Sequence, residues 1–209
     1  MVQYYERARD YLQRIVKGAT ANDPQSKNSQ LMSGITSDQA ARLSDAYFRA
    51  AMLETDMKNF KAAEKNYKEA LKRDPTSKII LFNIAWLNYK DLKSPENSAR
   101  YLKRLLKIHP NHLNGWLLLG YVHHNHTGDY AKARNAYETL IERSKNIPDG
   151  PEKNTAVVTA HFEICRLFQV DGKYKEGLHC LKQLSKAFPN DDSIIREIKH
   201  FEELVKSNK

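Results

Sequence analysis

The 209-residue sequence has no run of 18 apolar residues and only two cysteines. A helix that spans a bilayer needs about 20 mostly apolar residues, so no segment predicts a membrane span. Residues 1–16, MVQYYERARDYLQRIV, contain acidic residues and tyrosines where a secretory signal peptide has an uninterrupted apolar core. We therefore expect the protein to stay in the compartment where it is made, the cytoplasm, without inserting into a membrane.

The two cysteines, Cys165 and Cys180, are too few for the disulfide framework of a small secreted domain, and their spacing matches no C-x-x-C motif. Disulfides are rare in reducing compartments. We therefore expect both residues to be free thiols in a reducing interior.

The composition is that of a folded protein, and the charge favours some partners over others. Hydrophobic residues make up 41% of the chain and charged residues 28%, which is normal for a globular domain. The chain has 34 Lys and Arg against 25 Asp and Glu, a net charge of +9. This surplus favours acidic proteins, nucleic acid or anionic membrane surfaces, but it does not define a function.

Four segments of the sequence share one pattern, in which a small residue is followed four positions later by a large one and three positions further by another apolar one. They are FKAAEKNYKEALKRDP from Phe60, PENSARYLKRLLKIHP from Pro95, YAKARNAYETLIERSK from Tyr130 and YKEGLHCLKQLSKAFP from Tyr174. Positions i, i+4 and i+7 share one helix face, and a small residue lets two helix backbones approach closely. Each segment is therefore predicted to be the second helix of a packed pair. Pro75, Pro110 and Pro189 end three of these helices.

The first helix of each pair is predicted directly upstream, where a large residue precedes a small one by four positions. These segments are SDAYFRAAMLE from Ser44, KIILFNIAWLNY from Lys78, LNGWLLLGYVHH from Leu113 and VTAHFEICRLFQ from Val158. The sequences T-G-D-Y and D-G-K-Y separate the helices of the last two pairs. We expect tight turns there, with glycine in a backbone conformation that other residues resist.

The third pair carries W-x-x-L-G at Trp116, Leu119 and Gly120, followed by G-D-Y at residues 128–130. With the repeated pattern, this resembles the tetratricopeptide repeat family over roughly residues 44–190. The resemblance implies an all-α fold, a right-handed superhelix of stacked antiparallel helix pairs. The repeats are expected within residues 37–190, at about 44–77, 78–112, 113–150 and 158–190.

Three insertions are expected relative to the usual repeat of 34 residues, two of them in turns. The second and third repeats are each one residue longer, in the turns KDLKS and HNHT. The segments that align start 35, 35 and 44 residues apart, so nine further residues precede the fourth repeat, and we expect them within SKNIPDGPEKNT.

The two ends of the chain differ from the repeats. Residues 1–17 are predicted to form an amphipathic helix, with an apolar stripe at Tyr4, Ala8, Tyr11, Leu12 and Ile15. Residues 18–36 are rich in Gly, Ser, Asn and Asp and predict a linker. Residues 191–209 predict an amphipathic helix that caps the apolar face of the last repeat.

The resemblance also implies that the second, fifth, ninth and twelfth residues of each repeat line a concave groove. These positions hold more aromatic residues than a face in contact with solvent normally has, which indicates an interaction surface. They also include Ile79. The residues that we expect to bind a peptide are Phe48, Met52, Phe82, Trp86, Tyr89, Leu117, Tyr121, His124, Phe162 and Arg166. The aromatic residues would be apolar anchors, and Arg166 or His124 would fix a polar end. The alternative for each aromatic residue is packing between repeats.

For the other residues that could bind a metal or take part in catalysis, the sequence favours structural roles. His123 and His126 could begin a zinc site, but no further ligands lie at motif spacing, which favours polar turn residues. His161 and Cys165 occupy the packing positions of their helix, which predicts core filling rather than catalysis. We find no enzyme signature and expect no metal or cofactor.

Three functional hypotheses remain. The first is a non-catalytic adaptor whose groove binds an apolar or amphipathic peptide of a protein partner. The second is an RNA-binding helical-repeat module that uses the basic surface and the groove aromatics for stacking on bases. The third concerns residues 1–36, whose helix could dock in its own groove, self-associate with a neighbour or cap the first repeat.

Overall fold

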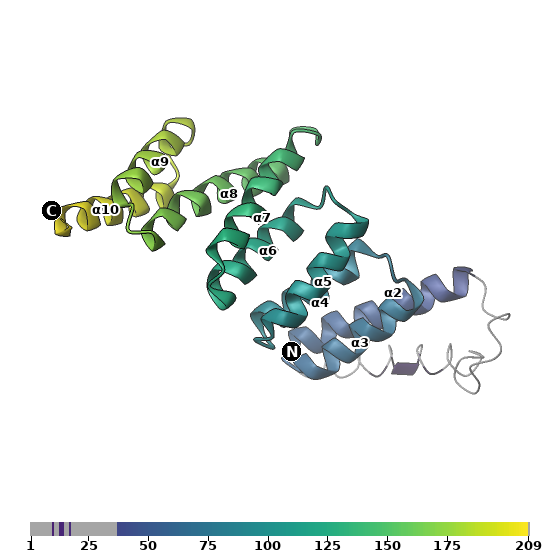
Figure 1. Ribbon diagram of the computed structural model, residues 1–209. Helices are drawn as coiled ribbons and strands as arrows, with labels where there is room; N and C mark the ends of the chain where they lie inside the picture. The colour runs from purple at the N-terminus through teal and green to yellow at the C-terminus, as the bar shows by residue number, and fades with distance from the viewer. Residues whose placement is uncertain (1–9, 11–12, 15–16, 18–36, 209) are drawn as a thin grey trace. The chain divides into compact units, whose positions relative to one another are not determined.

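The computed structural model describes residues 10, 13–14, 17 and 37–208, and within these residues it contains helices and no strands (Figure 1). The chain divides into two compact units, residues 1–109 and 110–209. The helices of unit 1 are α2 (Ser37–Asp56), α3 (Phe60–Arg73), α4 (Lys78–Lys90) and α5 (Pro95–Ile108). Those of unit 2 are α6 (Leu113–Val122), η2 (His123–Thr127), α7 (Tyr130–Ser144), α8 (Pro151–Val170), α9 (Tyr174–Ala187) and α10 (Asp192–Ser207).

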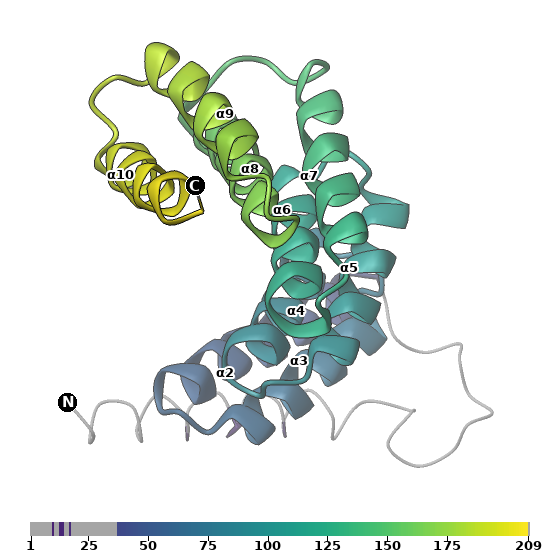
Figure 2. The same ribbon diagram turned by 60° about the vertical axis from the view of Figure 1, so that its left-hand side comes forward.

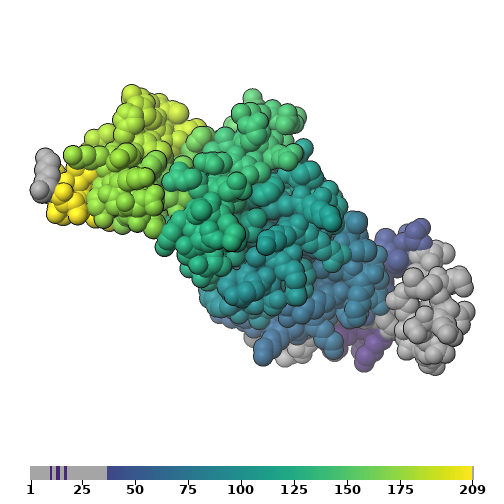
Figure 3. Space-filling view, viewed as in Figure 1, coloured from purple at the N-terminus to yellow at the C-terminus, as the bar shows by residue number. Residues whose placement is uncertain are grey.

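Consecutive helices pack as pairs, α2 with α3, α4 with α5, α6 with α7 and α8 with α9 (Figure 2). Side chains fill the spaces between the paired helices (Figure 3). The predicted small positions of the second helices are fully enclosed, since Ala63, Ser98 and Ala133 have no exposed surface. Ser98 also donates from Oγ to the carbonyl oxygen of Ala85 across its pair, at 2.9 Å. The repeated small and large positions therefore form the helix-pair interfaces, as predicted, and the fold is a solenoid-type stacking of antiparallel pairs.

Two helices of unit 2, α6 and α7, approach each other closely at Gly120 in α6. A Cβ atom built there would lie 2.1 Å from Cε1 of the Tyr137 ring in α7. Tyr137 itself has no exposed surface. Only glycine fits at this position without displacing a buried ring.

Each turn inside a helix pair contains one residue in the left-handed conformation. Gly128 and Gly172 have φ angles of 64° and 67°, as the glycine turns predicted. The corresponding positions of the first two repeats hold Lys58 (φ 62°) and Lys93 (φ 51°). An L-residue with a side chain is strained in this conformation, so the first two turns carry a cost that the last two avoid.

Each predicted proline stop is confirmed, because the second helices end two residues before Pro75, Pro110 and Pro189. The extra residue of the third repeat is accommodated in η2, a π-helical turn of five residues. A π turn accommodates one additional residue without breaking a helix.

The residues inserted before the fourth repeat are partly helical, and the first helix of that repeat begins earlier than predicted. Helix α8 starts at Pro151, seven residues before the predicted start at Val158, and only residues 145–150 connect it to α7. Pro151 is the first helical residue, a position where its fixed φ angle suits the helix and its missing N–H costs nothing. The insertion therefore lengthens the first helix of the last repeat.

The C-terminal helix caps the last pair, as predicted. Asp191 is the N-cap residue of α10, and its Oδ1 accepts from the backbone N–H groups of Ser193 and Ile194. Phe201 of α10 is fully buried, and its ring lies against Gly177 of α9, where a built Cβ would be 2.2 Å from Cε1.

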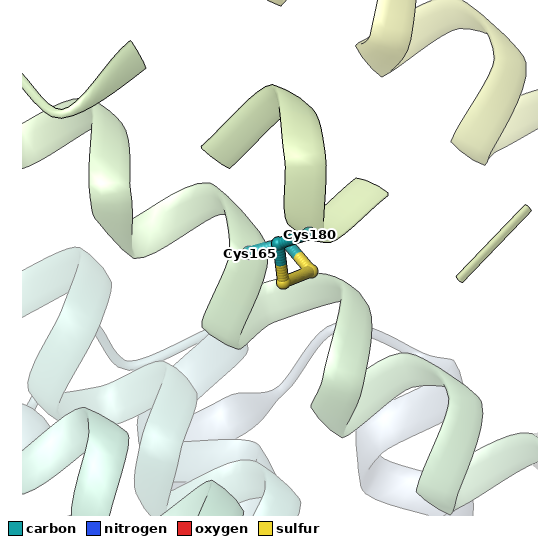
Figure 4. Close-up of a disulfide and its surroundings, with 2 residues drawn as sticks. All are labelled: Cys165 and Cys180. Atoms are coloured by element: carbon teal, nitrogen blue, oxygen red, sulfur yellow. A yellow bond between two sulfur atoms is a disulfide. The ribbon is translucent and has the colours of Figure 1, made fainter. Parts of the chain in front are cut away.

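The expectation of two free thiols is wrong. Cys165 of α8 and Cys180 of α9 form a disulfide, with their Cα atoms 5.5 Å apart (Figure 4). The reason is geometric, because both residues face the interface of one helix pair. Sequence spacing identified Cys165 as a packing residue but did not show that Cys180 faces it.

The predicted helix at residues 1–17, the linker at 18–36 and their possible self-association lie almost entirely outside the described residues. Within the described part of the chain, no helix is both long and apolar enough to cross a membrane.

Candidate peptide-binding face

The ten residues predicted to bind a peptide divide equally between the two units. Those of unit 1 are Phe48, Met52, Phe82, Trp86 and Tyr89, and those of unit 2 are Leu117, Tyr121, His124, Phe162 and Arg166. We call the first set, together with Ile79, the unit 1 face. The second set is called the unit 2 face.

Helix α4 provides most of the unit 1 face. Its sequence, KIILFNIAWLNYK, is apolar around almost its whole circumference, a composition typical of a helix buried on all sides. One side, which includes Ile80, Leu81 and Ile84, is buried in the unit. The other side carries Ile79 and Trp86, which remain 53% and 40% exposed.

The aromatic side chains along α4 form a row. The Phe82 and Trp86 rings stack with centroids 6.3 Å apart and an interplanar angle of 30°. The Trp86 and Tyr89 rings lie 6.0 Å apart at 48°. Ring contacts at these separations stabilise one another, so the row is held in place before any ligand binds.

Helix α2 contributes the remaining side chains of the unit 1 face. Phe48 is half-buried, and its ring lies 6.0 Å from that of Tyr67 in α3. Burial of the Tyr67 hydroxyl raises its pKa above the ordinary value, although a hydrogen bond with Thr55 opposes this shift. Met52 is 45% exposed. The unit 1 face therefore combines exposed apolar side chains with rings that are anchored in the core.

The unit 2 face is more buried and more polar. Leu117 and Tyr121 are half-buried and pack against the core formed by α6, α7 and α8. The Tyr121 ring meets the buried Tyr137 ring edge-on, with centroids 6.2 Å apart. These two predicted anchors therefore take part in internal packing.

Arg166 forms ion pairs within unit 2. Its Nε lies 3.1 Å from Oε1 of Glu197 in α10, and one terminal nitrogen lies 3.2 Å from Oε2 of Glu163 in α8. Its guanidinium also lies over the Phe162 ring, 5.8 Å from the centroid. Burial alone would lower the pKa of Arg166, but the charges and hydrogen bonds of the two glutamates outweigh it and raise the pKa. The charge predicted to fix a ligand is thus compensated inside the chain.

His124 lies beside the same glutamate. Its Nδ1 is 3.6 Å from Oε2 of Glu163, too far for a hydrogen bond, and this nitrogen is buried. The His124 ring also meets the Tyr130 ring edge-on at 5.7 Å. Glu163, which is only 6% exposed, is therefore the common neighbour of His124 and Arg166. The sequence reveals Glu163 through its i, i+3 spacing from Arg166, but nothing in it reveals Glu197, 31 residues away.

The structure assigns different environments to the remaining candidates. His161 is exposed, so the prediction that it fills the core is wrong, although neighbouring groups desolvate its ring enough to lower its pKa. Cys165 is in the core, as predicted. His123 is buried in η2, with Nδ1 3.3 Å from Oγ1 of Thr127. Within the described residues, no three side chains of His, Cys, Asp or Glu are grouped as a metal ion would require.

Comparisons with known proteins agree with this architecture. Residues 91–151 match the tetratricopeptide repeat family model, and residues 37–116 match that of the coatomer epsilon subunit. A tetratricopeptide repeat protein from Parabacteroides merdae superposes with a TM-score of 0.66 at 16% identity, covering 99% of this chain and 75% of that one. The MamA structure gives 0.64 at 15% identity, covering 87% of each chain. The predicted resemblance to the tetratricopeptide repeat family is confirmed over residues 91–151, and the chain has the fold of tetratricopeptide-repeat proteins.

Two curated proteins and one further structure are also similar. Protein O-mannosyl-transferase Tmtc3 of Drosophila melanogaster is 27% identical over 73% of this chain, and TMTC3 of Homo sapiens is 26% identical over 78%. The chain spans only 15% and 17% of their lengths. YrrB, described as a TPR protein with an unusual peptide-binding site, superposes with a TM-score of 0.60 at 16% identity, covering 78% of this chain and 80% of YrrB.

Proposed function

We propose that this chain is a non-catalytic protein-interaction scaffold that binds an apolar or amphipathic peptide segment on the unit 1 face. The observation that carries the proposal is the exposed side of α4, a mostly apolar helix in which Ile79 and Trp86 remain 53% and 40% exposed. Exposed apolar patches of this kind mark interaction surfaces.

The geometry of the face suits such a ligand. The Phe82, Trp86 and Tyr89 rings contact one another in a row along α4, and aromatic residues dominate the binding energy of protein interfaces. A pre-formed surface loses little conformational entropy when a peptide binds. The tetratricopeptide fold supports protein partners in general, and the description of YrrB supports a peptide in particular.

The unit 2 face is expected to play a smaller part. Arg166 is paired with Glu163 and Glu197, so an incoming carboxylate would have to compete with two internal carboxylates. Tyr121 and Leu117 already contribute to the core. We therefore expect Leu117, Tyr121 and Phe162 to supply apolar contacts, while Arg166 and His124 contribute little affinity.

The proposal can be tested by selecting peptides from a random library on the purified chain. Selected peptides should carry apolar anchors, and their affinity should fall about 30-fold or more in Trp86→Ala, the loss typical of a binding hot spot. The control is Ile108→Ala, which removes an exposed apolar side chain from α5 in the same unit. Equal losses in both variants would contradict a defined site on α4.

RNA binding remains the alternative, and no observation within the described residues favours it. It makes a different prediction about salt. RNA affinity should fall steeply between 50 and 200 mM salt, by about a thousandfold or more if six phosphates are contacted. Binding of an apolar peptide should change little over this range.

The curated relatives favour a second candidate function, recognition of protein segments for O-mannosyl transfer by a larger protein. The observation is the match to two proteins named as O-mannosyl-transferases, of which this chain resembles only a small part. An O-linked acceptor must present a hydroxyl group, so peptides selected on the unit 1 face should be enriched in Ser or Thr beside the apolar anchors. Selected peptides without such enrichment would count against this candidate.

The cytoplasmic location and the self-association through residues 1–36 stay predictions. The Cys165–Cys180 disulfide argues against a reducing compartment, because disulfides persist mainly in oxidising ones. Deleting residues 1–36 and measuring the molecular mass in solution tests self-association. If the number of chains per particle is the same before and after the deletion, self-association through these residues is excluded.

A further inference from the structure

The last helix pair has a smaller apolar core than the rest of unit 2. Its buried cluster consists of Cys165, Leu181 and Phe201. The partly buried residues packed around it are Phe162, Tyr174, Leu178, Cys180 and Ile198. The core of α6, α7 and α8 contains seven buried residues, including Tyr137 and Leu140. The disulfide therefore lies between α8 and α9, in the smaller of the two cores (Figure 4).

Helix α10 is attached mainly to α9. The Phe201 ring packs on Gly177, and Nζ of Lys182 lies 2.8 Å from Oε1 of Glu202. Since α9 is held to α8 by the disulfide as well as by packing, that bond contributes to the position of α10. If α9 separates from α8, α10 loses its support.

One contact links α10 directly to the unit 2 face. Glu197 of α10 pairs with Arg166 of α8, whose side chain is 40% exposed, while the Glu197 side chain is 19% exposed. Arg166 also lies over Phe162. The carboxylate that covers this end of the unit 2 face is thus carried by the helix whose support is the disulfide.

We propose that the Cys165–Cys180 disulfide is a redox-sensitive staple, whose reduction loosens α9 and α10, separates Glu197 from Arg166 and makes Arg166 and Phe162 available to a ligand. This proposal does not rest on peptide binding by the unit 1 face, since all its residues belong to unit 2. It describes a device that changes the unit 2 face while leaving unit 1 unaltered.

The chemical step is thiol–disulfide exchange with a dithiol reductant. A thiolate of the dithiol attacks Sγ of Cys180, the more exposed of the two cysteines, and the Cys165 thiolate leaves and takes up a proton. The second thiol of the reductant then attacks the mixed disulfide and releases Cys180. Two electrons and two protons pass to the protein, and the dithiol is oxidised to its own disulfide.

The test is hydrogen exchange of the full chain, resolved by peptide, with and without dithiothreitol. The disulfide joins residues 15 positions apart and restricts the chain when α9 and α10 open. Without this restriction opening is more favourable, so after reduction we expect hydrogen exchange in α10 to be faster by a factor on the order of 100. Helices α2 to α5 are the internal control and should not change. The variant Cys165→Ser/Cys180→Ser should show the fast α10 exchange in both conditions.

A second readout is modification of Arg166 by phenylglyoxal, measured by mass spectrometry. Reduction should increase its rate several-fold, and Glu197→Gln should do so with the disulfide intact and with α10 still protected. Unchanged α10 exchange after complete reduction would overturn the proposal. Faster exchange throughout unit 1 as well would also overturn it, because the bond would then stabilise the whole chain rather than hold α10.

Discussion

The substitution Gly120→Ala separates two effects that oppose each other. In an exposed helix interior, replacing Gly by Ala stabilises a protein by about 1 kcal/mol because alanine has the higher helix propensity. At Gly120 the new methyl group would lie 2.1 Å from Cε1 and 2.6 Å from Cδ1 and Cζ of Tyr137. The buried ring would have to move by more than an ångström in a packed core.

Overpacking of a core costs about 1–3 kcal/mol, and contacts this short place Gly120→Ala at the upper end. After subtraction of the propensity gain, we expect a net loss of about 2 kcal/mol, or roughly 10 °C in Tm for a unit of this size. Trp116 lies in the same helix and donates from Nε1 to the carbonyl oxygen of Pro110 at 2.8 Å. In a Trp86→Phe background it is the only tryptophan, so its fluorescence during urea unfolding reports on unit 2.

A double-mutant cycle with Tyr137→Leu is the control for this reasoning. The smaller leucine removes the clash, so Gly120→Ala should cost much less in that background than alone, and the two changes should not be additive. A stabilisation of about 1 kcal/mol in the otherwise unchanged Tyr137 background would show that propensity alone acts and that the close approach is absent.

The remaining predictions concern turns, caps and pH. Lys93→Gly should stabilise unit 1 by about 0.5–1 kcal/mol in urea unfolding, because Lys93 has a φ of 51°. Lys65→Gly, at an exposed position inside α3, should destabilise the same unit by about 1 kcal/mol. Asp191→Ala should cost about 1 kcal/mol by removing the N-cap of α10, and faster α10 hydrogen exchange without dithiothreitol should accompany it, while Asp191→Asn should keep the cap. His161 has a lowered pKa in the folded chain, so the unfolded chain binds its proton more readily and stability should fall as pH drops below about 7. His161→Gln should reduce that fall in the urea midpoint, and an unchanged pH dependence would contradict it.

The helix pairs could be predicted from the sequence because the signal is local and repeated. Ala133, Tyr137 and Leu140 share a face by their spacing alone, and all three are buried. The stops at Pro75, Pro110 and Pro189 and the left-handed Gly128 and Gly172 likewise follow from the properties of single residues. Lys58 and Lys93 could not be predicted in this way, because lysine has no preference for a positive φ. Only the alignment with the later turns identifies these two positions.

The features that the sequence did not predict depend on contacts between distant residues. Cys165 and Cys180 are bonded because their helices pack, and spacing alone left that open. His161 occupies a packing position in the repeat pattern yet is exposed, so the pattern alone did not show which side chains become buried. In the candidate site, the aromatic row of α4 followed from the repeat register, whereas the pairing of Arg166 with Glu197 required the position of α10.

The measurement that tests the unit 1 face most directly compares two isoleucines of the same unit. Ile79 lies on the face and is 53% exposed, while Ile108 lies at the end of α5 and is 39% exposed. Replacing isoleucine by alanine removes three carbon atoms, which would lower the affinity of a selected peptide about tenfold if roughly half of the side chain becomes buried on binding. By titration calorimetry with one such peptide, we expect a tenfold loss for Ile79→Ala and less than a twofold loss for Ile108→Ala. Equal affinities for the wild type and Ile79→Ala would contradict a binding site on the exposed side of α4.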